Sequence, residues 1–186
     1  MNPEAWDAII LGGGRGERLG GVSKSDLVVG TGSLLDLALA AVDGAAEAVI
    51  VGGARRDGVR WTLEDPPGGG PAAGLVAGLA LLADGREPAP WTVVLAVDTP
   101  GASQAVPWLL GARDADGAWI VDADGRAQPL IAVYRTAALA FEGDPHGSPM
   151  RTLVGRLDMV AVADPDAVAR DVDTWEDVEF WKERLS

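Results

Sequence analysis

Glycines and cationic side chains crowd together near the start of the sequence, directly after an apolar run that ends at Leu11. Glycine lets the backbone pass close to a ligand and turn its N–H groups into a concavity. Arginine forks match phosphate oxygens, and lysine supplies a point charge beside them. In a chain of net charge −13, this local reversal of sign predicts a polyphosphate-binding loop and disfavours a merely solvated turn. The residues are Gly12, Gly13, Gly14, Arg15, Gly16, Arg18, Gly20, Gly21 and Lys24.

This glycine-rich loop matches neither of the common nucleotide-binding patterns. A Walker loop requires glycine directly before the lysine, whereas Ser23 precedes Lys24. The dinucleotide pattern G-x-G-x-x-G fails as well, because its last glycine position falls on Glu17 or Leu19. A different phosphate-binding arrangement is therefore expected.

A carboxylate, Asp98, follows the strongest strand signal in the chain, Trp91 to Val97. Ligands of open α/β sheets bind at the carboxyl ends of the strands. A carboxylate opposite a phosphate loop is well placed to hold Mg²⁺ against phosphate oxygens. Aspartate before Thr99 and Pro100 is equally typical of a turn or a helix N-cap. The residues alone leave both interpretations open.

The elements that must position these groups alternate along the chain as short apolar runs and helix-compatible stretches. Continuous apolar runs separated by helices are typical of a mostly parallel sheet covered on both faces, so we predict one α/β domain. The expected strands are 7–11, 48–51, 60–64, 91–97, 118–122, 129–134 and 158–163, and the expected helices are 33–42 with Ser33 as N-cap, 70–83, 105–112, 150–155 and 174–185.

Composition excludes several classes of function. The chain has no cysteine and a single histidine, His146, which excludes disulfide scaffolds, thiol chemistry, iron–sulfur clusters and multi-histidine metal sites. A pI near 4.3 argues against duplex nucleic acid or an anionic membrane as a partner. The first residues lack the pattern of a secretion signal, and no apolar run is long enough to span a membrane, so a cytoplasmic location is expected.

Residues 11–24, LGGGRGERLGGVSK, resemble the signature L-A-G-G-x-x-x-R-M-G-x-D-K of nucleotidyltransferases that activate phosphorylated metabolites. Within that superfamily the chain is most similar, from Ala8 to about Trp181, to the MobA-like family of molybdenum cofactor guanylyltransferases. The resemblance implies a single three-layer, Rossmann-like nucleotidyltransferase domain over residues 1–186. It also implies nucleotide contacts at Leu11, Gly12, Gly13, Gly14, Lys24 and Asp98, catalytic roles for Arg15, Arg18, Lys24 and Asp98, and a Mg²⁺ cofactor bound by Asp98.

Two further segments resemble parts of the family that contact the nucleotide. Residues 64–75 resemble the family's E-D-x-x-x-x-G-P-L-A-G segment, which implies nucleotide contacts at Asp65, Gly70 and Gly74. The same residues also suit a turn followed by a helix start, with Pro71 near its first position. Gly52, at the end of the second strand, occupies a nucleotide-binding position where these guanylyltransferases often carry asparagine.

The acceptor half of the resemblance lies in two later segments. Residues 125–130 resemble the family's G-x-x-[QH]-P-L segment, so Arg126 and Gln128 are candidate acceptor contacts, with a simple hairpin turn as the open alternative. Residues 170–177 resemble N-x-N-T-P-E-[DE] before the last helix. Asp171 and Asp173 replace the paired asparagines there and are candidate acceptor ligands, and either is also a candidate second metal ligand. Thr174 and Asp177 form a predicted capping box.

The function implied by the resemblance is Mg²⁺-dependent transfer of GMP from GTP to molybdenum-molybdopterin, with release of pyrophosphate. Transient contact with molybdoenzymes or their chaperones would follow. Ser23 and Gly52 depart from the family pattern and leave open a sister transferase that uses CTP or another phosphorylated acceptor. A non-catalytic nucleotide or cofactor carrier is a third hypothesis, disfavoured because such a protein has little need for both Lys24 and Asp98.

Overall fold

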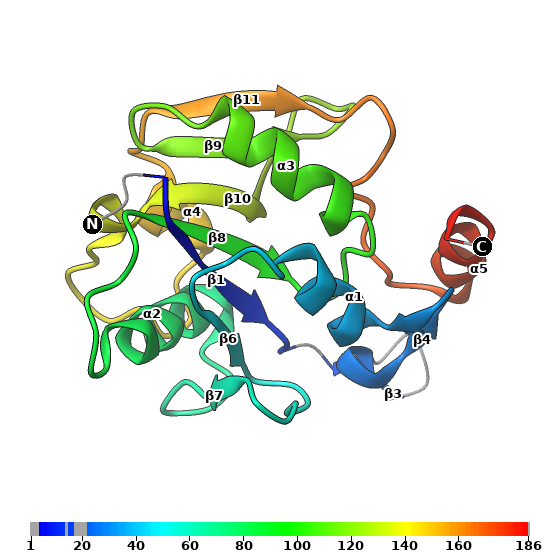
Figure 1. Cartoon of the computed structure of the whole chain (residues 1–186), viewed down its shortest axis with the longest axis horizontal. Coiled ribbons are helices and arrows are strands. Elements are labelled where there is room, and N and C mark those ends of the chain that lie inside the picture. Colours follow the sequence, from blue (N-terminus) through cyan, green and yellow to red (C-terminus); the bar gives the residue numbers. More distant parts are fainter. Residues whose placement is uncertain (1–3, 14, 17–21, 186) are drawn as a thin grey trace.

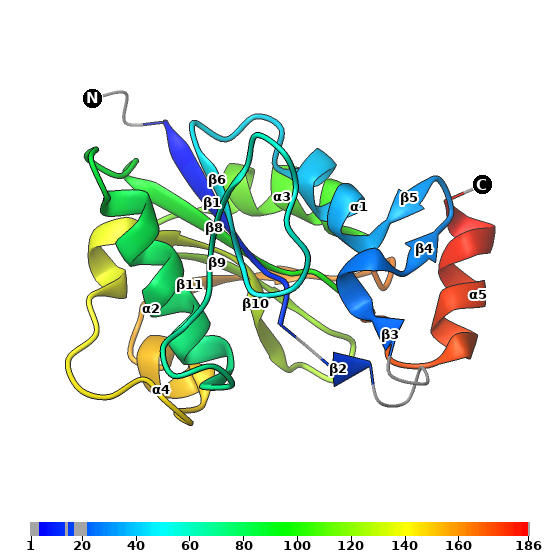
Figure 2. The same cartoon turned by 90° about the horizontal axis from the view of Figure 1, so that it is seen from below.

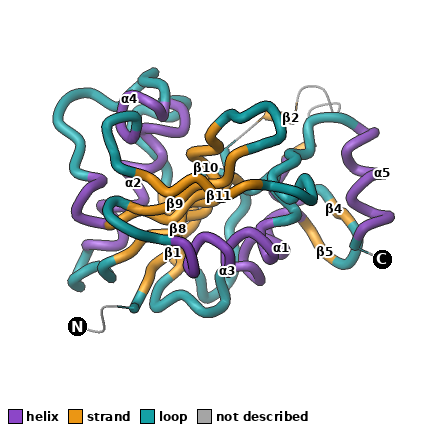
Figure 3. The backbone as a smooth tube through the Cα atoms, turned by 90° about the horizontal axis from the view of Figure 1, so that it is seen from above, coloured by secondary structure: helices purple, strands orange, loops and turns teal. Residues whose placement is uncertain are grey.

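The computed structural model describes residues 4–13, 15–16 and 22–185. Among these residues, seven strands form one sheet in the order β11-β9-β10-β8-β1-β6-β7, with helices on both faces (Figures 1 and 3). The strands are β1 (Trp6–Leu11), β6 (Ala48–Val51), β7 (Arg60–Thr62), β8 (Trp91–Ala96), β9 (Gly117–Val121), β10 (Ala127–Arg135) and β11 (Met159–Ala163). The helices are α1 (Leu34–Ala41), α2 (Gly70–Ala83), α3 (Ala102–Ala112), α4 (Met150–Val154) and α5 (Trp175–Arg184).

Strand β1 shows why the sheet must be covered on both sides. Ala8 and Ile10 belong to one hydrophobic cluster, and Ile9 and Leu11 belong to another on the opposite face. Side chains alternate across a strand, so an uninterrupted apolar run buries both faces. Helices α1, α3 and α5 contribute to the first cluster, and α2 and α4 contribute to the second. The predicted three-layer α/β architecture with a mostly parallel sheet is confirmed.

Strand β10 runs against the other strands of the sheet. It is antiparallel to both β8 and β9, whereas the remaining pairs are parallel. Its register with β9 shifts between Gln128 and Ala132, around Pro129, which has no N–H to donate to the ladder. The Tyr134 hydroxyl donates to the Pro129 carbonyl at 2.7 Å across this irregularity. The reversal places the start of β10 at the edge where the other strands end.

The structure also contains short elements that the sequence analysis did not predict, and all but η3 (Thr136–Leu139) lie close to the glycine-rich loop in the sequence. They are two hairpins, β2 (Arg15–Gly16) with β3 (Val22–Ser23) and β4 (Val28–Val29) with β5 (Gly32–Ser33), and two 3₁₀ helices, η2 (Lys24–Asp26) and η3. Strands of two residues have no readable periodicity. Figure 2 shows β4 and β5 lying beside α5, so the N-terminal and C-terminal parts of the chain meet here.

The longer predicted elements are all present, with ends that differ by a residue or two, except for α3. That helix begins at Ala102, three residues before the predicted start. The apolar pattern begins only at Ala105, while the polar residues Ser103 and Gln104 complete the first turn. No helix in the described part of the chain combines the length and apolar character of a membrane span.

Candidate functional site

A cavity of about 1010 Å³ opens at the edge of the sheet where the parallel strands end. Its wall includes Leu11 at the end of β1 and Gly13 after it, Gly70 and Gly74 at the start of α2, and Asp98 after β8. All five are residues that the sequence analysis assigned to nucleotide binding. The opposite part of the wall comes from the β9–β10 turn and from the segment between β11 and α5.

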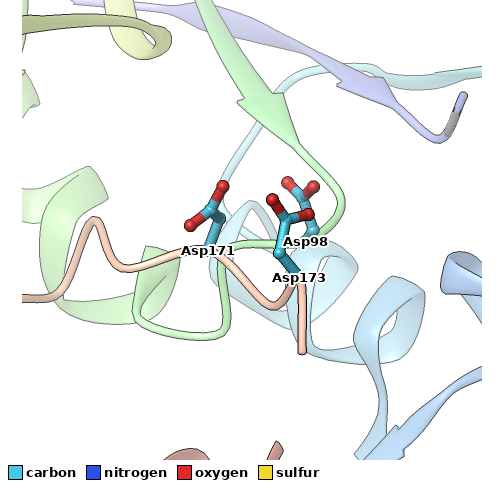
Figure 4. A group of neighbouring side chains, drawn as sticks. All are labelled: Asp98, Asp171 and Asp173. Atoms are coloured by element: carbon cyan, nitrogen blue, oxygen red, sulfur yellow. The ribbon is translucent and has the colours of Figure 1, made fainter. Parts of the chain in front are cut away.

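Three carboxylates converge beside this cavity. Asp98 follows β8, and Asp171 and Asp173 come from the segment that leads into α5; one oxygen from each lies within 4.8 Å of the others (Figure 4). The N–H of Val172 donates to the Asp98 carbonyl at 2.9 Å, which fixes the two segments together. Val172 is fully buried, so its side chain anchors the segment in the core while its two neighbours reach Asp98.

The ammonium of Lys24 joins this carboxylate cluster. Its Nζ donates to Asp98 Oδ2 at 2.8 Å and to Asp173 Oδ1 at 2.5 Å, and the lysine is buried. Burial opposes the charged form, but the hydrogen bonds to Asp173 and Asp98 outweigh burial and raise the pKa of Lys24 above its usual value. Lys24 is therefore a cation at neutral pH, and the structure brings it together with Asp98 as the sequence analysis expects.

The carboxyl of Asp171 differs from its two neighbours in its electrostatic surroundings. Burial of the carboxyl within the cluster and the nearby charges of Asp173 and Asp98 raise its pKa above the ordinary value. Lys24 hydrogen-bonds the other two carboxylates and only partly offsets this repulsion at Asp171. A cluster of three carboxylates with one ammonium carries excess negative charge, which favours a further cation.

Close backbone packing positions the glycine-rich loop. The Gly12 N–H donates to the Val51 carbonyl at 2.8 Å, and the Ser25 hydroxyl donates to the Gly12 carbonyl at 3.2 Å. Gly53 has a φ of +60°, and a Cβ there would lie 2.6 Å from the Gly12 carbonyl oxygen. Only glycine fits this left-handed backbone at such a close approach. The contact joins the ends of β1 and β6 and holds η2, which carries Lys24.

Several predicted nucleotide contacts lie outside the cavity wall. Gly52 uses both backbone groups within the fold, since its N–H donates to the Thr62 carbonyl and its carbonyl accepts from Trp61. Gly12 and Asp65 are likewise not on the wall, although Glu64, which the sequence analysis did not select, is. Gly14 and Arg18 lie outside the described residues, as does the side chain of Arg15.

Of the two acceptor contacts predicted near the β9–β10 turn, one lies on the cavity wall and the other does not. Gln128 is on the cavity wall, where its Nε2 donates to Asp122 Oδ2 at 2.8 Å. The other Asp122 oxygen accepts the N–H groups of Asp124 and Arg126, and the Arg126 N–H is the largest influence that lowers the pKa of Asp122. The Arg126 side chain is exposed, is not on the wall and pairs with Asp124. The hairpin-turn interpretation therefore accounts for Arg126 in this structure.

The predicted capping box at α5 is present and contacts the carboxylate cluster. Asp177 Oδ2 accepts the Thr174 N–H at 2.9 Å, the Thr174 hydroxyl at 2.7 Å and the Asp173 N–H at 3.2 Å. Burial opposes ionisation of Asp177, but hydrogen bonds from Thr174 and Arg170 lower its pKa to about 2. Asp177 is therefore an anion that ties the start of α5 to the segment carrying Asp173.

The sequence is similar to that of known proteins over most of its length. A family model described as the MobA-like NTP transferase domain matches residues 8–160. The molybdenum cofactor guanylyltransferase of Acidiphilium cryptum is 39% identical over 140 residues, which are 70% of this chain and 67% of the relative. The enzyme of the same name from Rhodopseudomonas palustris is 34% identical over 145 residues, which are 72% of this chain and 67% of the relative.

Solved structures under 25% identical share the fold. Molybdopterin-guanine dinucleotide biosynthesis protein A from Archaeoglobus fulgidus has a TM-score of 0.66 at 17% identity, covering 96% of this chain and 97% of that one. A manganese complex of Rv0371C from Mycobacterium tuberculosis has a TM-score of 0.67 at 20% identity, covering 96% and 98%. With the family model over most of the chain and two relatives above 30% identity, the chain belongs to the MobA-like NTP transferase family and is a nucleotidyltransferase.

Proposed function

We propose that the chain transfers GMP from GTP to the phosphate of molybdopterin that carries molybdenum. The observation that carries the proposal is the meeting of Lys24 with Asp98 and Asp173 beside a cavity at the carboxyl edge of the sheet. A phosphate-binding cation and metal-binding carboxylates are the two parts that phosphoryl chemistry requires. The names of the two curated relatives support guanylyl transfer to this acceptor.

Mg²⁺ is the proposed cofactor, and the residues present fit it. Asp98, together with Asp171 or Asp173, would hold the ion through carboxylate oxygens, which are the ligands that Mg²⁺ prefers. Three such oxygens lie within 4.8 Å of one another, and the cluster keeps excess negative charge despite Lys24. When bound, the ion neutralises and orients the triphosphate. The manganese complex among the similar solved structures supports a divalent metal at this kind of fold.

The reaction requires placement and charge stabilisation more than proton transfer. An oxygen of the acceptor phosphate forms a bond to the α-phosphorus of GTP, the bond from that phosphorus to the β-phosphate oxygen breaks, and pyrophosphate leaves. The attacking phosphate is already an anion at neutral pH, so no general base is needed. We assign Lys24, with Arg15 and Arg18 of the loop, to the negative charge that develops on the phosphates. The backbone at Gly13, on the cavity wall, would face the same phosphates.

The two halves of the cavity suit the two substrates of this reaction. The half formed by Leu11, Gly70 and Gly74 is the proposed nucleotide side, where glycines allow close approach. The half that includes Gln128 and Leu130 is the proposed acceptor side. Asp98 and the carboxylate cluster lie between the segments that form these halves, where the two phosphates must meet.

Substitution of Asp98 by asparagine tests the proposal. Pyrophosphate release would be measured with GTP, Mg²⁺ and molybdenum-molybdopterin, and we expect Asp98→Asn to lower the rate by roughly 10²–10³, equivalent to about 3–4 kcal/mol of barrier. Asp84→Asn is the matched control, because Asp84 is exposed and pairs with Arg60 away from the cavity. Equal rates for Asp98→Asn and the unaltered protein would end the assignment.

The choice of base is tested separately by thermal stabilisation. A nucleotide that binds the folded chain raises its midpoint of unfolding, and at equal concentration the tighter ligand raises it more. We expect GTP with Mg²⁺ to stabilise the chain more than CTP, ATP or UTP at equal concentration. Clearly greater stabilisation by CTP would replace the guanylyl assignment with the cytidylyl alternative that Ser23 and Gly52 leave open.

A further inference from the structure

The cavity wall is strongly acidic, with one exception. Among its described residues, the ionisable side chains are six carboxylates and a single base, that of Arg170. The carboxylates are Glu64, Asp98, Asp122, Asp124, Asp164 and Asp171. An anion that enters the acceptor half is repelled by such a wall unless a cation receives it. Arg170 is the described wall residue that can do so.

Arg170 is held in a fixed position by helix α5. Its Nε and Nη2 donate to Asp177 Oδ1 at 2.9 and 2.7 Å, and its guanidinium lies 4.3 Å from the centroid of the Phe180 ring. Its carbonyl accepts from the Trp181 indole at 3.1 Å. The side chain is still 35% exposed, and within the described residues its Nη1 makes no hydrogen bond. This arrangement preorganises the guanidinium of a residue on the cavity wall and leaves its Nη1 donors available to a ligand.

Asp177 connects Arg170 to the carboxylate cluster. One of its oxygens accepts from Arg170, and the other accepts the Asp173 N–H at 3.2 Å. Arg170 also directly precedes Asp171 in the chain. A phosphate bound to the free edge of this guanidinium would therefore lie beside the cluster where the nucleotide phosphates are proposed to bind. Arginine suits this task, because its planar donors match two phosphate oxygens at once.

We propose that Arg170 binds the phosphomonoester of the acceptor substrate and that Asp177 and Phe180 position it. The inference rests on the proposed function in that it assigns the anionic end of the acceptor to one residue. The acceptor is then recognised as a small molecule with a terminal phosphate, whatever the remainder of its structure. With Arg170 in this role, Asp171 and Asp173 are assigned to the metal ion and not to the acceptor phosphate.

Equilibrium binding without nucleotide tests the assignment. The affinity of molybdopterin and of its dephosphorylated form would be measured for the unaltered protein, Arg170→Gln and Arg170→Lys. Loss of a charge-assisted pair predicts roughly 10- to 100-fold weaker binding of the phosphorylated pterin by Arg170→Gln. Arg170→Lys should recover part of this loss, since it keeps the charge and loses the fork. Binding of the dephosphorylated pterin and the KM for GTP should stay unchanged in both variants.

The matched control is Arg184→Gln, which removes a second cation near Phe180 from the exposed side of the same helix. Arg184→Gln should change neither the affinity for the phosphorylated pterin nor that for the dephosphorylated pterin. Two results would overturn the proposal. The first is a folded Arg170→Gln variant that binds the phosphorylated pterin as tightly as the unaltered protein does. The second is an equal loss of affinity for both pterins. If Arg170→Gln does not fold, the same comparison is made with Arg170→Lys.

The proposed function and this inference fail in different ways. An unaltered protein that binds the phosphorylated pterin but transfers no GMP overturns the proposed function, and the binding comparison still decides the role of Arg170. An unaltered protein with equal affinity for both pterins overturns the role of Arg170, whether or not transfer occurs.

Discussion

The ammonium of Lys24 contacts two of the three carboxylates that are proposed to hold a divalent metal ion, so the two cations would compete for them. Lys24 donates to Asp98 and Asp173, two of the three carboxylates in the cluster. Two unit charges 2.8 Å apart, as for Lys24 and Asp98, interact by roughly 1.5–6 kcal/mol at effective dielectric constants between 80 and 20. The lysine therefore lowers the affinity of the cluster for a metal ion until nucleotide phosphates give its ammonium another partner.

Lys24→Met separates the effect of the lysine on metal affinity from its effect on the rate of transfer. We expect the variant to bind Mn²⁺ roughly tenfold more tightly in the absence of nucleotide, because a competing cation is gone. We expect its rate of transfer to fall by roughly 10²–10³, because a cation that stabilises the phosphates is lost. Titration calorimetry or the EPR signal of free Mn²⁺ measures the first, and pyrophosphate release measures the second.

Lys182→Met is the control for this prediction, since Lys182 is exposed on α5 and pairs with Glu179. It should leave metal affinity and rate unchanged. Mn²⁺ affinity of Lys24→Met equal to or below that of the unaltered protein would contradict the competition between the two cations.

At the level of single residues, the sequence was informative where strand ends locate side chains. Lys24 and Asp98, which are 74 positions apart, were predicted to share a site because each follows a buried strand of a parallel sheet. Asp65 and Gly52 were selected by motif alone, and neither is on the cavity wall. Arg170 was missed, because its orientation depends on contacts with α5 that sequence spacing does not report.

Two helices begin with the same capping box but have different surroundings. Ser33 and Asp36 cap α1, and Thr174 and Asp177 cap α5. The pKa of Asp36 is lowered chiefly by the Arg56 guanidinium, in contacts away from the cavity. Asp177 instead holds Asp173 and Arg170. The two boxes form a matched pair in which the local structure is alike and the link to the site differs.

The pKa of Asp177 predicts how stability depends on pH. Its folded value of about 2 lies below the ordinary 3.8, so its contribution is full above about pH 4 and is lost as the pH falls toward 2. Asp177→Asn should lower the free energy of unfolding by about 1–2 kcal/mol at pH 7. Urea titrations should show this difference narrowing below pH 4.

Asp36→Asn supplies the comparison for activity. It should lower the free energy of unfolding by about 0.5–1 kcal/mol as a lost cap, with an unchanged transfer rate. Asp177→Asn should lower both stability and rate, because Asp173 and Arg170 lose their shared partner. Equal rates for the two variants would show that the α5 cap serves only the helix.

At the level of elements, long periodic segments were predictable and strand direction was not. Helix α2 has the predicted bounds, 70–83, because its apolar residues, Pro71 and the preceding turn agree. The antiparallel direction of β10 was not predicted, since the hairpin turn that imposes it was one of two interpretations that the sequence left open for residues 125–130. The small hairpins near the glycine loop depend on tertiary contacts rather than on local pattern.

The C-terminal helix lies beyond the residues matched by the family model, yet it is part of the core. Trp181 and Val178 are buried in the cluster shared with α1 and α3. Trp181→Ala should lower the free energy of unfolding by about 3–5 kcal/mol, a large share of the 5–15 kcal/mol typical of a domain. Urea unfolding followed by far-UV circular dichroism measures this loss.

Trp175→Ala is the corresponding control on the same helix. Trp175 is 54% exposed, so its removal should change the free energy of unfolding by less than about 0.5 kcal/mol. A small effect of Trp181→Ala, comparable to that of Trp175→Ala, would mean that α5 does not contribute to the stability of the sheet.

The hydrogen bond from the Val172 N–H to the Asp98 carbonyl closes the intervening chain into a loop with fixed ends. Between those two positions lie β9, β10 and β11, which belong to the sheet, and the mostly exposed β9–β10 turn, 122–126, whose sequence can change while the ends stay joined. Substitutions in that turn, part of which lines the cavity, can therefore alter which acceptor fits without rebuilding the carboxylates and the lysine at the strand ends.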